Sequence, residues 1–200
     1  MATWLTHLRV SERLINKIKI SDNSLFFAGS IAPDTDISPD ISHWCVSGDK
    51  STCDVNGFFS KYLSNHDNSE DFDFYLGYYI HLLTDVMWQK QKIPSLKMLD
   101  EDTIRNVKES WRSADYNFLS NQKEFYPIIA MGDTAKYEKL WFDYYTLSQV
   151  KEIVEYITNL YKVYSKNKTL YVDMNVKQEI EQFIEEASID IYKKLREVIK

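Results

Sequence analysis

Residues that break helices are scarce in this chain of 200 residues, which contains only 5 glycines and 4 prolines. Because glycine and proline are the least favourable residues inside a helix, their scarcity favours a helical fold. No apolar run is long enough to cross a membrane, and the first residues, MATWLTHLRVSERL, lack the uninterrupted apolar segment of a secretion signal. We therefore expect a globular, cytoplasmic protein without a transmembrane segment.

Basic residues form no block anywhere in the sequence. The chain has 24 Lys and Arg against 30 Asp and Glu, a formal net charge of -6, so no extended nucleic-acid surface is expected. A small phosphorylated substrate is compatible with this charge, because a buried metal ion would supply positive charge locally. The only two cysteines, Cys45 and Cys53, are expected to be thiols in a reducing compartment rather than a disulfide.

The hydrophobic periodicity predicts one all-helical domain over residues 1–200. Between about 20 and 55 the pattern breaks, and Ser, Asp, Pro and Gly predominate. We predict a long irregular loop there, ordered by apolar residues such as Phe26, Phe27 and Ile31. No strand pattern exceeds four or five residues. Helices are predicted at about 3–19, 55–64, 71–91, 100–114 and 147–165, in two shorter pieces within 116–145, and from Asp173 or Asn175 to about 198.

Two residues of the helix predicted over 71–91 could chelate a cation. His81 and Asp85 are four residues apart, so they lie one turn apart on one helix face. His7 occupies the apolar face of the first predicted helix, where a buried imidazole needs a partner. The alternative for both histidines is a structural role, with hydrogen bonds inside the core.

Two further candidates, Asp34 and His43, fall in the segment predicted to be a loop. Such a segment often gains its order from a ligand, although Asp34 could equally be a turn or cap residue. Together with His7, His81 and Asp85 they form a set of three imidazoles and two carboxylates. This donor set suits zinc or a similar divalent ion.

Four motifs in the first half of the chain resemble those of the zinc-dependent phospholipase C family. They are W-L-T-H-L-R, then A-G-S-I-A-P-D, then S-H-W, and then F-Y-L-G-Y-Y-I-H-L-L-T-D. The likeness covers residues 3 to about 90 and extends, more distantly, to the single-strand-specific zinc nucleases. It implies a multi-helix fold of the phospholipase C and nuclease type, and hydrolysis of a small phosphoester or a phospholipid head group.

The resemblance also assigns roles to the five residues. Asp34, His43, His81 and Asp85 would hold one zinc ion, and Asp85 would bridge to a second ion that His7 also binds. Asp34 would in addition orient or deprotonate the attacking water, which makes it the catalytic residue.

The chain departs from the family pattern after Asp85. Members with three ions carry another histidine shortly after this aspartate and a later His-x-x-x-Glu pair, whereas here the sequence continues VMWQKQ and no histidine follows His81. We therefore expect one or two ions. Two functions remain open: a zinc-dependent phosphoesterase, and an inactive helical relative that serves as a metal-binding or binding module.

Two weaker signals are set aside. The adjacent pair His66 and Asp67 is typical of another class of helical phosphohydrolase, but here it lies in a polar stretch that predicts a solvated loop. Cys45 follows His43 closely and could be a soft ligand, but a small buried thiol is the preferred interpretation.

Overall fold

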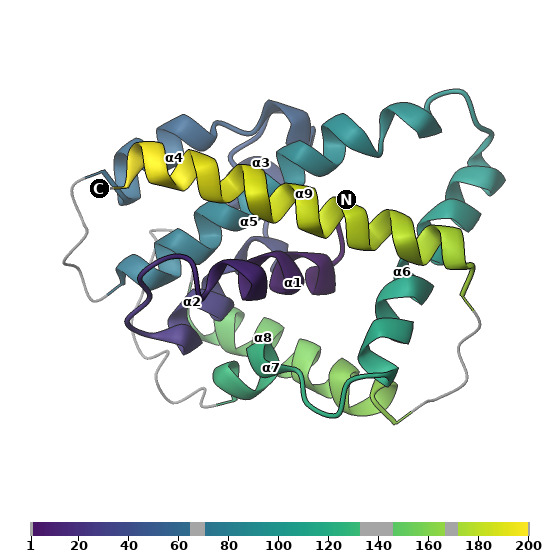
Figure 1. Ribbon diagram of the computed structural model, residues 1–200. Helices are drawn as coiled ribbons and strands as arrows, with labels where there is room; N and C mark the ends of the chain where they lie inside the picture. Colours follow the sequence, from purple (N-terminus) through teal and green to yellow (C-terminus); the bar gives the residue numbers. More distant parts are fainter. Residues whose placement is uncertain (1, 65–70, 133–145, 167–171, 200) are drawn as a thin grey trace.

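The computed structural model describes residues 2–64, 71–132, 146–166 and 172–199 (Figure 1). Within these ranges the regular structure is helical, apart from one isolated bridge between Val46 and Asp49, so the all-helical prediction is confirmed. No helix in the described part of the chain has the length and apolar character needed to cross a membrane. The α-helices are α1 (Trp4–Leu14), α2 (Asn23–Gly29), α3 (Pro39–Ser42), α4 (Val55–Tyr62), α5 (Phe72–Gln91), α6 (Glu101–Ser120), α7 (Tyr126–Met131), α8 (Leu147–Tyr164) and α9 (Met174–Val198), with 3-10 turns η1 (Ala32–Asp34), η2 (Lys50–Thr52) and η3 (Pro94–Leu96).

Side chains that cap helix N-termini fix where several helices begin. Thr3 caps α1, Asp100 caps α6 and Asp173 caps α9, each accepting a hydrogen bond from a backbone N–H of the first turn. Thr146 and Gln149 form a reciprocal capping box at the start of α8. The predicted starts of α6 and α9 are thus confirmed.

Residues 20–55 are ordered, as predicted, but they do not form one irregular loop. This segment contains α2, η1, α3 and η2, and each of these is too short to show a helical repeat in the sequence. Asp22 caps α2 by accepting from the N–H groups of Ser24 and Leu25. The expected anchoring to the core is confirmed, because Phe26, Phe27 and Ile31 are fully buried.

Two predicted helix lengths also need correction. The first helix ends at Leu14 rather than near residue 19, and α6 continues to Ser120 rather than ending near 114. The two short helices predicted within 116–145 correspond in part to the end of α6 and to α7, while residues 133–145 lie outside the described residues.

Helix α5 is the centre of the molecule. Every residue from Leu76 to Asp85 is buried, as expected for a helix that is surrounded by other elements. Helices α1, α2, α4 and α9 all contact it, and the long α9 also packs on α1 (Figure 1). One cluster of buried apolar side chains joins α1, α2 and α4 to α9.

Two glycines allow α2 and α5 to pack backbone against backbone. A Cβ atom added at Gly29 would lie 2.0 Å from the carbonyl oxygen of Phe74, and one added at Gly77 would lie 2.0 Å from that of Phe26. No other residue type fits at either position without moving a helix. This close contact places the carbonyl of Ser30 beside α5, one turn after Gly77.

Candidate metal centre

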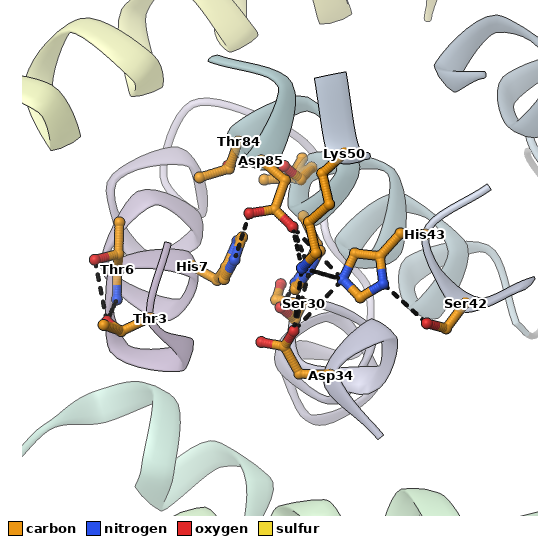
Figure 2. A network of polar contacts seen from close by, with 12 residues as sticks. Thr3, Thr6, His7, Ser30, Asp34, Ser42, His43, Lys50, Thr84 and Asp85 are labelled. Carbon is orange, nitrogen blue, oxygen red and sulfur yellow. Dashed lines mark hydrogen bonds and ion pairs between the residues drawn. The ribbon is translucent and has the colours of Figure 1, made fainter. Parts of the chain in front are cut away.

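The five residues singled out in the sequence converge in the interior, and Figure 2 labels four of them: His7, Asp34, His43 and Asp85. His7 comes from α1, Asp34 from the end of η1, His43 from the C-cap of α3, and His81 and Asp85 from α5. Asp85 lies at the middle of the group: its Oδ1 is 3.6 Å from His7 Nε2, and its Oδ2 is 3.5 Å from the Nε2 atoms of both His43 and His81. Elements that are remote in the sequence therefore supply one compact cluster.

Hydrogen bonds at Nδ1 turn the Nε2 atoms of His43 and His81 toward the cluster. His81 Nδ1 lies 2.9 Å from the Ser30 carbonyl oxygen, which can only accept, so this nitrogen carries the proton. His43 Nδ1 lies 2.8 Å from the Ser42 hydroxyl. Such contacts fix the tautomer and orientation of histidines that bind metals through Nε2.

The two Nε2 atoms are 3.2 Å apart. When His81 is neutral, the Ser30 carbonyl selects the tautomer whose Nε2 carries a lone pair. His43 Nε2 accepts a hydrogen bond from the Lys50 ammonium at 2.6 Å, so it too presents a lone pair. In the structure the cation beside these nitrogens is the Lys50 ammonium, and the same nitrogens are placed to bind a metal ion. Ligands about 2.1 Å from one tetrahedral ion are about 3.4 Å apart, close to the separation seen here.

His7 stacks on His81, with ring centroids 3.6 Å apart and an interplanar angle of 10°. Neither nitrogen of His7, nor Oδ1 of Asp85, has a hydrogen-bond partner among the described residues, and all three atoms are buried. Burial and the neighbouring His81 lower the pKa of His7 to about 4, so the imidazole is neutral near pH 7. A neutral, buried nitrogen 3.6 Å from a carboxylate oxygen fits a cation shared between them.

Both carboxylates of the cluster are ionised. Burial alone would raise the pKa of Asp34, but His81, His43 and Lys50 hold it below its usual range. Burial likewise opposes ionisation of Asp85, and its contacts with His7 and His81 prevail and hold its pKa well below the usual range. Two negative charges in an interior site require positive charge nearby.

Sequence reasoning missed Lys50, which lies inside the cluster. Its Nζ is 2.6 Å from Asp85 Oδ2, 2.6 Å from His43 Nε2 and 3.6 Å from Asp34 Oδ1, and its side chain is only 7% exposed. A lysine in a polar segment is typical of a solvated surface. The available signal was that Lys50 is the sole Lys or Arg between Lys19 and Lys61, in the same segment as two predicted ligands.

Asp34 connects the cluster to a cavity of about 360 Å³. The walls carry aromatic rings from α1, α6 and α8 together with the charged side chains of Lys108, Arg112 and Asp115 on α6. The aromatic residues are Trp4, Trp111, Tyr116 and Tyr156. The cluster therefore has one side that faces a space large enough for a small organic molecule.

The cysteines are free thiols. The Cys45 thiol lies 3.3 Å from the Pro39 carbonyl oxygen, and burial raises the pKa of Cys53 to about 12, so neither presents a thiolate to the cluster. His66 and Asp67 lie outside the described residues.

The chain was compared with protein-family models, with curated proteins and with solved structures, and none of these comparisons gave a match. What the site does must therefore be argued from its own geometry. Two overlapping groups bring one donor atom from each residue within 4.8 Å of the others: His7, Asp34 and His81, and His43, His81 and Asp85. The convergence of the five residues is a structural fact, while their role as ligands stays a prediction.

Proposed function

We propose that this protein is a metal-dependent phosphoesterase that binds one or two zinc-like ions in the buried cluster. The arrangement of His43 and His81 carries the proposal: their Nε2 atoms point at each other across 3.2 Å beside two ionised carboxylates. Imidazole nitrogens held at this separation beside carboxylates form a donor arrangement that a zinc-like ion binds. The proposed ligands are His7, Asp34, His43, His81 and Asp85.

The donor set fits a divalent ion of the zinc type, which binds imidazole nitrogen and carboxylate oxygen. When bound, such an ion polarises a phosphoryl oxygen and lowers the pKa of a bound water from about 15.7 toward about 7. Asp34 is the cluster residue that reaches the cavity, so it is placed to orient the attacking water by accepting a hydrogen bond. Its lowered pKa makes it a weak base, which favours orientation over proton removal.

The cavity supports a phosphoester of an organic alcohol as the substrate. Lys108 and Arg112 lie in the wall, and although Arg112 also pairs with Glu109, both can donate hydrogen bonds to a phosphate group. The aromatic walls offer apolar surface to the organic part of the molecule. A phosphodiester or phospholipid-like substrate agrees with both features.

The test is hydrolysis of chromogenic phosphodiesters and phosphomonoesters by protein purified without chelator, with zinc, manganese or calcium added and metal content measured in parallel. We expect metal-dependent turnover by the parent protein and at least a hundredfold loss in Asp85→Asn, a variant that retains shape but loses the shared charge. The matched control is Asp190→Asn on the exposed surface of α9, which should retain activity. Equal turnover by the parent and Asp85→Asn would exclude this site.

One observation favours the second candidate, an inactive relative that keeps the cluster for structural reasons. The Lys50 ammonium already neutralises part of the negative charge without any metal. A parent protein that binds no zinc and hydrolyses none of these substrates would support this second function.

A further inference from the structure

The ammonium group of Lys50 is placed where an ion would have to bind. It contacts Oδ2 of Asp85 and Nε2 of His43 at 2.6 Å each, and Oδ1 of Asp34 lies 3.6 Å away. These atoms are all donors in the proposed ligand set. An ion about 2.1 Å from the same nitrogen and oxygen would overlap the ammonium and repel its charge. Lys50 and a metal ion therefore compete for one position.

The charges of the cluster explain why the lysine is held there. The ammonium forms ion pairs with the carboxylates of Asp85 and Asp34, and its three N–H bonds can satisfy a carboxylate and an imidazole together. Without Lys50, the fully buried carboxylate of Asp85 and the partly buried one of Asp34 would lose their ammonium partner, which is unfavourable. The ammonium thus occupies the position that a bound ion would take.

The segment that carries Lys50 belongs to the surface. Val46 and Asp49 pair across a tight turn, in which Ser47 and Gly48 have positive φ angles of 53° and 71°. Val46 is 68% exposed, and only the side chain of Lys50 reaches inward from this turn. A long, unbranched side chain on an exposed turn can change rotamer without disturbing the core.

We propose that Lys50 is a built-in competitor of the metal ion: its ammonium holds the carboxylates together in the metal-free protein and withdraws when an ion binds. Lys50 thereby sets the metal affinity of the centre. The inference rests on the proposed function only in requiring that the cluster binds an ion. It makes no use of hydrolysis. It identifies Lys50 as the residue that determines whether the cluster binds a metal ion tightly or weakly.

The experiment compares Lys50→Met with the parent and with Lys123→Met, a matched change of a lysine that is exposed after the end of α6. Zinc affinity is measured by competition with a chromogenic chelator, and melting temperature is measured with and without zinc. We expect Lys50→Met to bind zinc at least about tenfold more tightly, because loss of a buried charge contact of about 1.4 kcal/mol corresponds to that factor. Its metal-free form should melt at a lower temperature than the parent, and Lys123→Met should match the parent in both measurements.

The outcomes separate the two proposals. Equal or weaker zinc binding by Lys50→Met, with zinc bound by the parent, overturns the competition and leaves the metal site in place. Tight binding by Lys50→Met and none by the parent supports the competition, and it favours the inactive relative as the native function. Zinc binding by neither protein overturns both proposals.

A second measurement on the parent protein covers the case in which Lys50→Met does not fold. Amine acetylation is followed by peptide mass spectrometry with and without zinc. We expect Lys50 to react slowly in the metal-free protein and several times faster with zinc, while Lys123 reacts equally in both. A Lys50 rate that zinc leaves unchanged would contradict withdrawal of the side chain.

Discussion

Asp115 is a buried carboxylate between the start of α1 and the middle of α6. It accepts hydrogen bonds from the hydroxyl groups of Thr3 and Thr6, and Arg9 forms an ion pair with it at 3.6 Å. Burial raises the pKa of Asp115 to about 6 even though all three neighbours favour the ionised form. The group therefore costs stability wherever it is ionised in the folded protein.

The sign of the pH effect follows from these values. The folded pKa of about 6 exceeds the ordinary value of 3.8, so the folded protein binds the proton more tightly than the unfolded chain. The stabilisation by this proton is complete below about 3.8 and is lost as the pH rises through 6. A pKa difference of this size corresponds to roughly 3 kcal/mol.

We predict that Asp115→Asn, which stays neutral, gains stability relative to the parent by roughly 2 kcal/mol as the pH rises from about 4.5 to about 7.5. Urea unfolding of both proteins across this range measures the difference in free energy of unfolding. For Asp190→Asn, a control at an exposed position, the difference in free energy of unfolding from the parent should change little with pH. A flat difference for Asp115→Asn would show that the fold does not disfavour the charge.

His7 offers a second test at the scale of single residues. We predict that His7→Ala remains folded but binds less zinc than the parent, because its Nε2 and Asp85 Oδ1 are buried cluster atoms that have no hydrogen-bond partner among the described residues. Elemental analysis of zinc-loaded protein and circular dichroism measure the two properties. His66→Ala is the matched control, since His66 belongs to the pair that we set aside. If His66→Ala loses zinc and His7→Ala does not, the ligand set is wrong.

At the scale of elements, the contact between α2 and α5 aligns the cluster. Gly29 and Gly77 bring the two backbones together, and His81 is oriented by the Ser30 carbonyl one residue beyond α2. The buried hydroxyl of Ser30 also lies 2.8 Å from that of Ser11 on α1. Any increase in the distance between α2 and α5 would therefore turn the His81 ring away from its partners.

We predict that Gly77→Ala destabilises the fold by about 1–3 kcal/mol or more, because its methyl group meets the backbone of Phe26. Gly132→Ala is the control, as the nearest atom to its added Cβ is 3.3 Å away. Thermal or urea unfolding compares the two variants with the parent. A Gly77→Ala protein as stable as Gly132→Ala would mean that the helices are not packed this closely.

The elements also show how far the sequence could predict this structure. Helices such as α5, α8 and α9 are long enough for their apolar positions to repeat several times, so their periodicity identified them. Helices α2 and α3, of seven and four residues, offer two turns at most and were taken for loop. His7 and the His81–Asp85 pair were found because such residues are unusual on apolar helix faces, and Asp34 and His43 were found in a polar segment that a ligand could order. Lys50 was missed because a lysine shows no pattern that distinguishes an inward from an outward side chain.

At the scale of the whole molecule, the cluster joins four separate elements. An ion held by His7, Asp34, His43 and Asp85 would link α1, η1, α3 and α5, and these elements pair only in the native state. A ligand that binds only the folded protein stabilises it by mass action, by about 2.7 kcal/mol at 100 times the dissociation constant.

We therefore predict that zinc raises the melting temperature of the parent protein and that excess chelator lowers it again. Asp85→Asn should show no such response, because it loses the carboxylate that contacts three histidines. Differential scanning fluorimetry on protein of known metal content measures the shift. If the metal-containing parent protein melts at the same temperature in excess chelator, the ion does not contribute to the stability of the fold.

The cluster and the cavity come from different halves of the chain. The charged residues that meet around Asp85 all lie between His7 and Asp85, whereas most of the cavity wall lies on α6 and α8, between Lys108 and Ile157. Substitutions in the second half could therefore alter which molecules enter without touching the cluster. Evolutionary descendants of this chain could therefore change their ligand preference through the second half, while the first 85 residues remain constrained by the need to form the cluster.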